Sequence, residues 1–243
     1  MDWKIIHIDE VDSTNNWLRE HANSSPDSLS NDSPICVVAE YQTAGKGCGT
    51  NRWESERGKN LLISLLIHPT EVSANRQFAI SQWVSVALCE LLERYTQKKV
   101  QIKWPNDIYV EDKKIAGILI ENTLHGDHIK DSIIGIGLNV NQWEFHSDAP
   151  NPVSLCQLLG HELNKEALLD EFLQGKPMVS PEETDGFRYG NRLYRKGQFA
   201  TYEDQNGRFQ ATLYDVEPDG HLILNDESGQ QRRYAFKEVQ FII

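Results

Sequence analysis

The chain has 243 residues, with 24 Lys and Arg against 36 Asp and Glu, which gives a formal net charge of −12 at pH 7. A negative charge of this size repels phosphate backbones unless basic residues gather in one place, which argues against general binding of DNA or RNA. The four cysteines include no C-x-x-C pair and no apolar run is long enough to cross a bilayer, so we expect a cytoplasmic protein without structural zinc, disulfides or a membrane span.

The pattern up to residue 141 predicts strands and two helices. In chain order these are a strand at residues 3–8, a helix at 14–22, strands at 35–40 and 60–68, a helix at 74–95, and strands at 100–104, 108–110, 115–121 and 132–141. Residues 23–34 are rich in Ser, Asn and Asp and are expected to form an exposed connection. A long loop inside a compact domain is usually functional, so the glycine-rich stretch between residues 40 and 60 is a candidate binding loop.

The C-terminal part of the chain has a different pattern of predicted elements. A helix is predicted at residues 163–173, a polar linker at 175–185, and a short helix or turn that ends near residue 194. Five short strands follow at residues 198–203, 208–216, 221–225, 231–236 and 239–242, separated by tight turns, which is typical of a small β-barrel. We therefore predict two domains, residues 1–188 and 189–243.

The first chemical signal is the segment AGKGCGTNRW at residues 44–53. Its three glycines let backbone amides approach an anion, and Lys46 and Arg52 add positive charge. It is neither a P-loop nor a dinucleotide fingerprint, because Gly47 follows Lys46 and Thr50 takes the place of the third glycine. From these residues alone, a ligand loop and a mobile surface turn are equally good interpretations.

The second signal is KWPND at residues 103–107, followed by a hairpin that returns at KIAG, residues 114–117. Pro105 ends the strand and leaves Asn106 and Asp107 at a strand end, where catalytic side chains are often found. By itself such a segment is more often an ordinary turn, and an edge lysine such as Lys114 is usually a solvated charge.

The third signal is GIGLNVN at residues 135–141. Glycines that alternate with apolar residues in a strand indicate that something approaches the backbone closely, either a helix or a ligand. Without further context we favour helix packing.

Together the three segments resemble the catalytic domain of biotin-protein ligases, which share a superfamily with lipoate-protein ligases. The resemblance runs from DSTN at residues 12–15 through EYQTA at 40–44, the glycine loop and KWPND with its KIAG hairpin to Asn139, and more weakly into the C-terminal strands. The combination of KWPND with the hairpin is highly specific. The resemblance implies an α+β fold, with a mixed sheet and helices packed on it, and a C-terminal SH3-like barrel.

The same resemblance implies a reaction. The carboxylate of biotin attacks the α-phosphate of ATP, which gives biotinyl-5′-adenylate and pyrophosphate, and a lysine of a biotin carboxyl carrier protein then attacks the adenylate. The implied ligands are biotin, ATP and Mg²⁺. No enzyme nucleophile is needed, in agreement with the lack of a Gly-x-Ser-x-Gly elbow. Positioning and charge neutralisation therefore carry the chemistry.

The resemblance also implies roles for individual residues. Those expected to bind biotin are Ser13, Thr14, Gln42, Gly45, Lys46, Lys114 and Gly117. Those expected to bind the nucleotide are Gly47, Cys48, Arg52, Trp53, Asn106 and Asn139. Lys114, Asp107 and Lys46 are the implied catalytic residues, with Lys114 between carboxylate and α-phosphate and Asp107 beside the incoming lysine. No residue is assigned as a metal ligand.

Two features depart from the commonest pattern of these ligases. Cys48 stands where the loop usually carries a second arginine, so Lys46 or Arg52 must compensate or the adenylate is held less tightly. The catalytic pattern begins at Ser13, which leaves no room for an N-terminal DNA-binding domain and predicts the monofunctional type. We also expect a monomer or weak homodimer. Two alternatives remain: a lipoate-protein ligase or octanoyltransferase of the same fold, and a non-catalytic biotin-binding protein.

Overall fold

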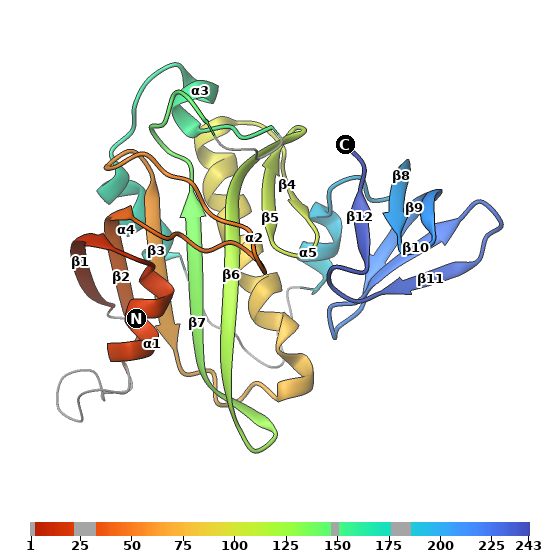
Figure 1. Ribbon diagram of the computed structural model, residues 1–243, viewed down its shortest axis with the longest axis horizontal. Coiled ribbons are helices and arrows are strands. Elements are labelled where there is room, and N and C mark those ends of the chain that lie inside the picture. Colours follow the sequence, from red (N-terminus) through yellow and green to blue (C-terminus); the bar gives the residue numbers. More distant parts are fainter. Residues whose placement is uncertain (1–2, 22–32, 147–150, 176–185) are drawn as a thin grey trace.

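The computed structural model describes residues 3–21, 33–146, 151–175 and 186–243, which form two sheets and their covering helices (Figure 1). The predicted connection at residues 23–34 and the predicted linker at 175–185 lie almost entirely outside the described residues. None of the described helices is both long and apolar enough to span a membrane.

Seven strands form the larger sheet, in the order β1, β2, β3, β7, β6, β5, β4. The first two, β1 (Lys4–Val11) and β2 (Ile35–Gln42), are parallel, and the other neighbours are antiparallel, so the sheet is mixed as predicted. The remaining strands are β3 (Leu61–Ile67), β4 (Val100–Lys103), β5 (Asp107–Val110), β6 (Lys113–His125) and β7 (His128–Leu138).

Helices cover both faces of this sheet. Successive residues of a strand point to opposite faces, and here the residues on both faces are apolar, so both must be buried. On β2, Cys36 and Val38 join the main core under α2 (Phe78–Thr96), whereas Ile35 and Val37 pack with Leu18 of α1 (Thr14–His21). Figure 1 shows α1 and α2 on opposite faces. The helix predicted at residues 74–95 begins instead with a separate 3₁₀ turn, Ala74–Arg76.

Three shorter helices complete the larger unit: α3 (Leu155–Leu159), α4 (Lys165–Gln174) and α5 (Gly186–Arg192). The last two confirm the predicted helix at residues 163–173 and the predicted short helix after the linker. The sequence pattern did not predict α3, because its five residues are too few to show a helical period. It begins with a capping box between Ser154 and Gln157.

The five C-terminal strands form a second, antiparallel sheet in the order β11, β10, β9, β8, β12. They are β8 (Phe199–Asp204), β9 (Gly207–Val216), β10 (Leu222–Asp226), β11 (Gln231–Tyr234) and β12 (Val239–Phe241), each within a few residues of its prediction. This second antiparallel sheet fits the predicted SH3-like domain, although within the described ranges no ladder joins β11 to β12 to close a barrel. The predicted domain boundary falls inside α5 and stays a prediction.

The smaller sheet packs against the KWPND segment. The indole nitrogen of Trp104 donates a hydrogen bond to the Gly220 carbonyl at 2.9 Å, and its ring meets Phe236 edge-on at 6.2 Å between centroids. The hydroxyl of Tyr189, on α5, donates to the Pro105 carbonyl at 3.1 Å. The two contacts of Trp104 place the C-terminal strands beside the loop that carries the most specific motif of the chain (Figure 1).

Candidate active site

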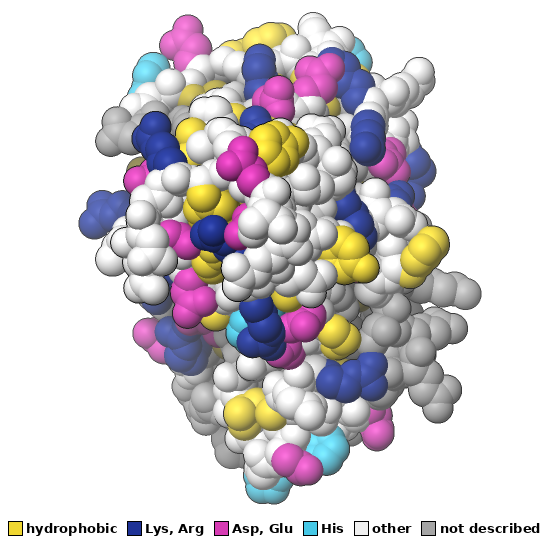
Figure 2. Space-filling view, turned by 90° about the vertical axis from the view of Figure 1, so that its right-hand side faces the viewer, with side chains coloured by type: hydrophobic (Ala, Val, Ile, Leu, Met, Phe, Trp, Pro, Cys, Tyr) yellow, Lys and Arg dark blue, Asp and Glu magenta, His cyan; other side chains and the backbone are white. Residues whose placement is uncertain are grey.

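A cavity of about 990 Å³ lies where the larger sheet, the glycine loop and the C-terminal strands meet. Among the described residues, the charged ones that line it are five basic side chains, Lys46, Arg52, Lys103, Lys114 and Lys237, and one carboxylate, Asp107. Basic and acidic side chains are interspersed over the face shown in Figure 2, whereas the cavity lining is mostly basic. The cavity therefore concentrates the positive charge that an anionic ligand requires.

One end of the cavity is polar and buried. The backbone N–H and the hydroxyl of Thr14 donate to the side-chain oxygen of Gln42 at 2.8 and 3.1 Å. The Ser64 hydroxyl lies 2.7 Å from the Thr14 hydroxyl and 2.5 Å from the side-chain oxygen of Asn15. Ser13, also predicted, is buried beside them. These groups suit a neutral ligand group with both donors and acceptors, and Asn15 is a lining residue that the sequence interpretation missed.

The glycine loop forms a small hairpin above the sheet. The Gly47 N–H donates to the Asn51 carbonyl and the Trp53 N–H to the Gly45 carbonyl, both at 2.9 Å. A Cβ on Gly45 would lie 2.6 Å from the carbonyl oxygen of Trp53, so this position accepts only glycine. Gly45 itself is buried and does not line the cavity, whereas Gly47, Cys48, Arg52 and Trp53 do.

The Trp53 ring lies on two glycines of the sheet. A Cβ on Gly137 of β7 would overlap the indole, and one on Gly117 of β6 would lie 3.0 Å from it. A Cβ on Gly135 would overlap the Asn15 amide at the start of α1. The close approach predicted from GIGLNVN therefore involves both a helix and a binding loop. Trp53 presents a fixed aromatic surface inside the cavity.

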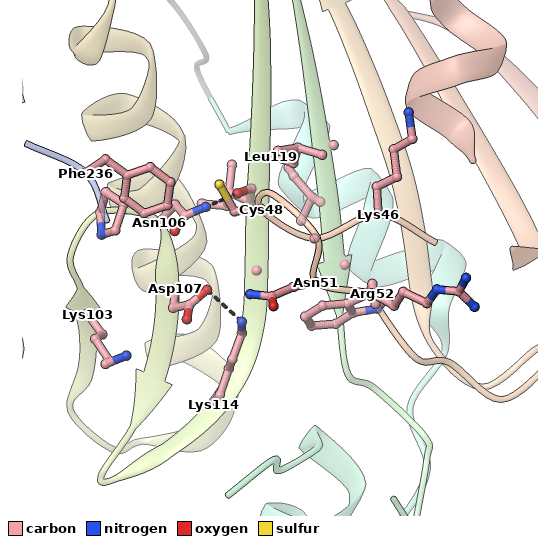
Figure 3. A pocket seen from close by; sticks show the side chains of 18 of the residues that line it. Lys46, Cys48, Asn51, Arg52, Lys103, Asn106, Asp107, Lys114, Leu119 and Phe236 are labelled. Atoms are coloured by element: carbon pink, nitrogen blue, oxygen red, sulfur yellow. Dashed lines mark hydrogen bonds and ion pairs between the residues drawn. The ribbon is translucent and has the colours of Figure 1, made fainter. Parts of the chain in front are cut away.

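Lys114 and Asp107 form an ion pair at 2.7 Å, drawn as a dashed line in Figure 3. Their hairpin contains a β-bulge, because Ile108 pairs with Ala116 whereas Tyr109 pairs with Lys114. Residues three apart in a regular strand point to opposite faces of the sheet. The extra residue of the bulge moves the side chains that follow it to the other face, so Lys114 and Gly117 both reach the cavity. Asn106 also lines the cavity, and its amide donates to the Ile118 carbonyl.

Asn139 does not line the cavity. Its amide donates to the Val153 carbonyl at 3.1 Å, and its N–H donates to the Ile115 carbonyl at 2.9 Å. The backbone of Lys114 pairs on its outer side with residues 151–153, through bonds of 2.9 Å to Asn151 and Val153. Asn139 thus supports the strand that holds Lys114, and the cavity lining gives no support to its predicted contact with the nucleotide.

Several lining residues were not predicted. Five of them come from the C-terminal sheet, for which the sequence carried no recognisable chemical signal: Phe236, Lys237, Val239, Gln240 and Phe241.

Lys103 was inside the KWPND motif but was assigned no role. Its ammonium lies 5.4 Å from the ring centroid of Phe241 and 5.6 Å from that of Tyr109. Burial lowers the pKa of Lys103, and the opposing charge of Asp107 does not restore it.

The sequence profile of the Biotin/lipoate A/B protein ligase family matches residues 8–139. The Biotin--[acetyl-CoA-carboxylase] ligase of Paracoccus denitrificans is 30% identical over 207 residues, which are 80% of this chain and 85% of that protein. The Bifunctional ligase/repressor BirA of Bacillus spizizenii is 28% identical over 248 residues, 97% of this chain and 73% of that protein. The solved structure of a mutant biotin protein ligase from Aquifex aeolicus in complex with biotin superposes with a TM-score of 0.75 at 26% identity, over 98% of both chains.

Proposed function

Because the chain belongs to the biotin/lipoate A/B protein ligase family, we propose that it activates biotin with ATP and transfers the biotinyl group to a lysine of a carrier protein. The observation that carries the proposal is the Lys114–Asp107 pair in a cavity that has four further basic side chains and a buried polar end. Two anions, a carboxylate and a triphosphate, can meet there only because fixed cations offset their repulsion.

The two ends of the cavity suit the two substrates. The buried polar end around Thr14 and Gln42 receives the ring system of biotin, whose ureido group has both donors and acceptors. The basic residues line the part that receives the nucleotide, and Trp53 packs on the adenine ring. The valeryl tail of biotin then passes Gly117 and brings its carboxylate to Lys114.

In the first step, a carboxylate oxygen of biotin attacks the α-phosphorus of ATP and pyrophosphate leaves. The Lys114 ammonium stabilises the negative charge on both reacting groups. In the second step, the amine of the carrier lysine attacks the carbonyl carbon of the adenylate and AMP leaves. Asp107 orients that amine and accepts its proton, so the two members of the pair serve successive steps.

A Mg²⁺ ion fits this site when the triphosphate supplies most of its ligands. Asp107 is the one carboxylate that lines the cavity in the described part of the chain, and Mg²⁺ usually combines one or two carboxylates with waters and substrate phosphates. Asp107 and Asn106 are the side chains that would hold it. When bound, the ion neutralises negative charge on the phosphates.

The carrier we propose is a biotin carboxyl carrier protein, because the Paracoccus relative is named for acetyl-CoA carboxylase.

We place the reaction in the cytoplasm, since all four cysteines are free in the structure and three of them are buried. The protein needs no nucleic acid for this reaction.

The test is incubation with labelled biotin, ATP, Mg²⁺ and a carrier domain, with lipoate and octanoate in parallel. Label on the carrier that depends on ATP and biotin supports the proposal. Labelling by lipoate or octanoate instead would assign the protein to the other branch of the superfamily. Binding of biotin with no release of pyrophosphate would assign it to the non-catalytic alternative.

A further inference from the structure

The position of Cys48 in the glycine loop lacks a positive charge. Burial raises the pKa of its thiol, so the side chain is neutral at pH 7. Neither basic residue of the loop replaces the missing charge. The Lys46 ammonium lies 2.5 Å from the side-chain oxygen of Asn16, and Figure 3 shows it and the Arg52 guanidinium pointing away from the Lys114–Asp107 pair.

A lysine from the C-terminal sheet lies next to Cys48. Lys237 belongs to the turn between β11 and β12 and lines the cavity. A Cβ on Gly49 would collide with its ammonium, and would lie 3.1 Å from its Cε, so the lysine reaches across the loop next to Cys48. Gly49 has φ of +70°, which favours glycine there for a second reason.

The Lys237 ammonium has no ion pair with any carboxylate in the described ranges. It shares the cavity with Lys103 and Lys114, and its charge acts on the Cys48 thiol together with those of Asp107 and Lys114. Several like charges around one cavity repel each other, and an anion bound between them relieves that repulsion.

We propose that Lys237 binds a phosphate group of the nucleotide across the glycine loop and supplies the positive charge that Cys48 lacks. The inference rests on the proposed function, since it assumes that the cavity holds the adenylate. It makes the C-terminal sheet part of the nucleotide site, and a change there would alter adenylate retention without touching the larger sheet.

The first test measures the rate at which biotinyl-adenylate leaves the protein. Lys237→Met keeps the length of the side chain and removes its charge, and we expect release to become about threefold to tenfold faster, since the group is exposed and partly screened. Lys237→Arg should stay near the wild-type rate. Lys99→Met, at an exposed lysine in the turn between α2 and β4, is the matched control and should have no effect.

A second variant tests the compensation itself. Cys48→Arg added to Lys237→Met should restore slow release, because it returns a cation to the loop. Release from Lys237→Met at the wild-type rate would overturn the inference and leave the proposed function standing. A wild-type protein that forms no adenylate would instead refute the proposed function.

A third measurement needs no substrate. The other three cysteines are buried, so alkylation by iodoacetamide reports on Cys48, identified by peptide mapping. Lys237→Met should slow this alkylation by about threefold at mildly alkaline pH, because a neighbouring positive charge favours the thiolate. Equal rates for the variant and the wild type would show that the lysine does not lie against the loop and would overturn the inference whatever the enzyme activity.

Discussion

The Lys114 ammonium lies 2.7 Å from a carboxylate oxygen of Asp107, on the neighbouring strand of the β5–β6 hairpin. The two side chains are 28% and 23% exposed, so most of the surface of the pair is shielded from solvent. An anionic substrate that binds Lys114 must share this ammonium with Asp107. The pair thus keeps a cation in a defined position before the substrate arrives, which is the preorganisation that electrostatic catalysis requires.

Replacement of Lys114 should stop adenylate formation. Lys114→Met retains most of the aliphatic stem, which packs beside Gly117, and loses the charge between the two anions. We expect the rate of pyrophosphate release to fall by about a hundredfold to a thousandfold, as when one stabilising donor is removed from an active site. Urea unfolding checks that the variant is folded, and normal pyrophosphate release by a folded variant would contradict the assignment.

Replacement of Asp107 should affect the second step more than the first. Asp107→Asn keeps the shape of the side chain but cannot accept a proton, so transfer from preformed biotinyl-adenylate to the carrier should slow by about a hundredfold. Adenylate formation should change less, because Lys114 remains and the asparagine side chain still offers an oxygen to Mg²⁺. Single-turnover measurements separate the two steps, and equal losses in both would mean that Asp107 acts only through Lys114.

Local patterns were sufficient to predict most of the architecture. The strands and the long helix have apolar residues at regular spacing, and their predicted ends lie within a few residues of the structure for most elements, although β6 extends further at its C-terminal end. The β-bulge at Ile115 could not be predicted, because KIAG opens an apolar run without alternation, in which an extra residue leaves no visible break. It is the bulge that turns both Lys114 and Gly117 toward the cavity.

The sequence predicted the lining residues that belong to a recognisable motif. It did not predict those that reach the cavity only through contacts between distant segments. Five residues of the C-terminal sheet, from Phe236 to Phe241 without Glu238, reach the cavity because Trp104 and Phe236 pack together, a contact between positions far apart in the chain. No local pattern encodes such packing. Asn139 is a different case: its place in a motif suggested contact with a ligand, and this stays a prediction, while its amide bonds to the backbone at Val153.

The stability of the C-terminal sheet should depend on pH through Asp226. Its carboxylate accepts hydrogen bonds from the Ser228 side chain and from the backbone of Ser228 and Gln230, and pairs with Arg232 at 2.9 Å. These contacts hold the pKa of Asp226 at about 2, below the ordinary value of 3.8. A lowered folded pKa gives stability that is present above the unfolded pKa and is lost as the pH falls through about 2.

Asp226→Asn should therefore be less stable than the wild type at neutral pH, and the difference should shrink between about pH 4 and pH 2. Urea midpoints measured across this range give the comparison. Glu227→Gln is the matched control, because it removes the same charge from the exposed neighbouring residue. A difference between Asp226→Asn and the wild type that persists unchanged at the lowest pH would contradict the linkage.

The contact between Gly137 and Trp53 can be tested by a double-mutant cycle. In a strand, alanine is normally tolerated better than glycine, so Gly137→Ala would be neutral or mildly stabilising if nothing lay above the backbone. Because its Cβ would overlap the Trp53 indole, we expect a loss of about 1 to 3 kcal/mol in the free energy of unfolding, the usual cost of overpacking. In the background Trp53→Ala the same substitution should cost nothing, and urea unfolding of the four proteins measures the coupling. Equal effects of Gly137→Ala in both backgrounds would mean that the indole does not rest on this glycine, and that the glycine loop closes over the cavity in some other way.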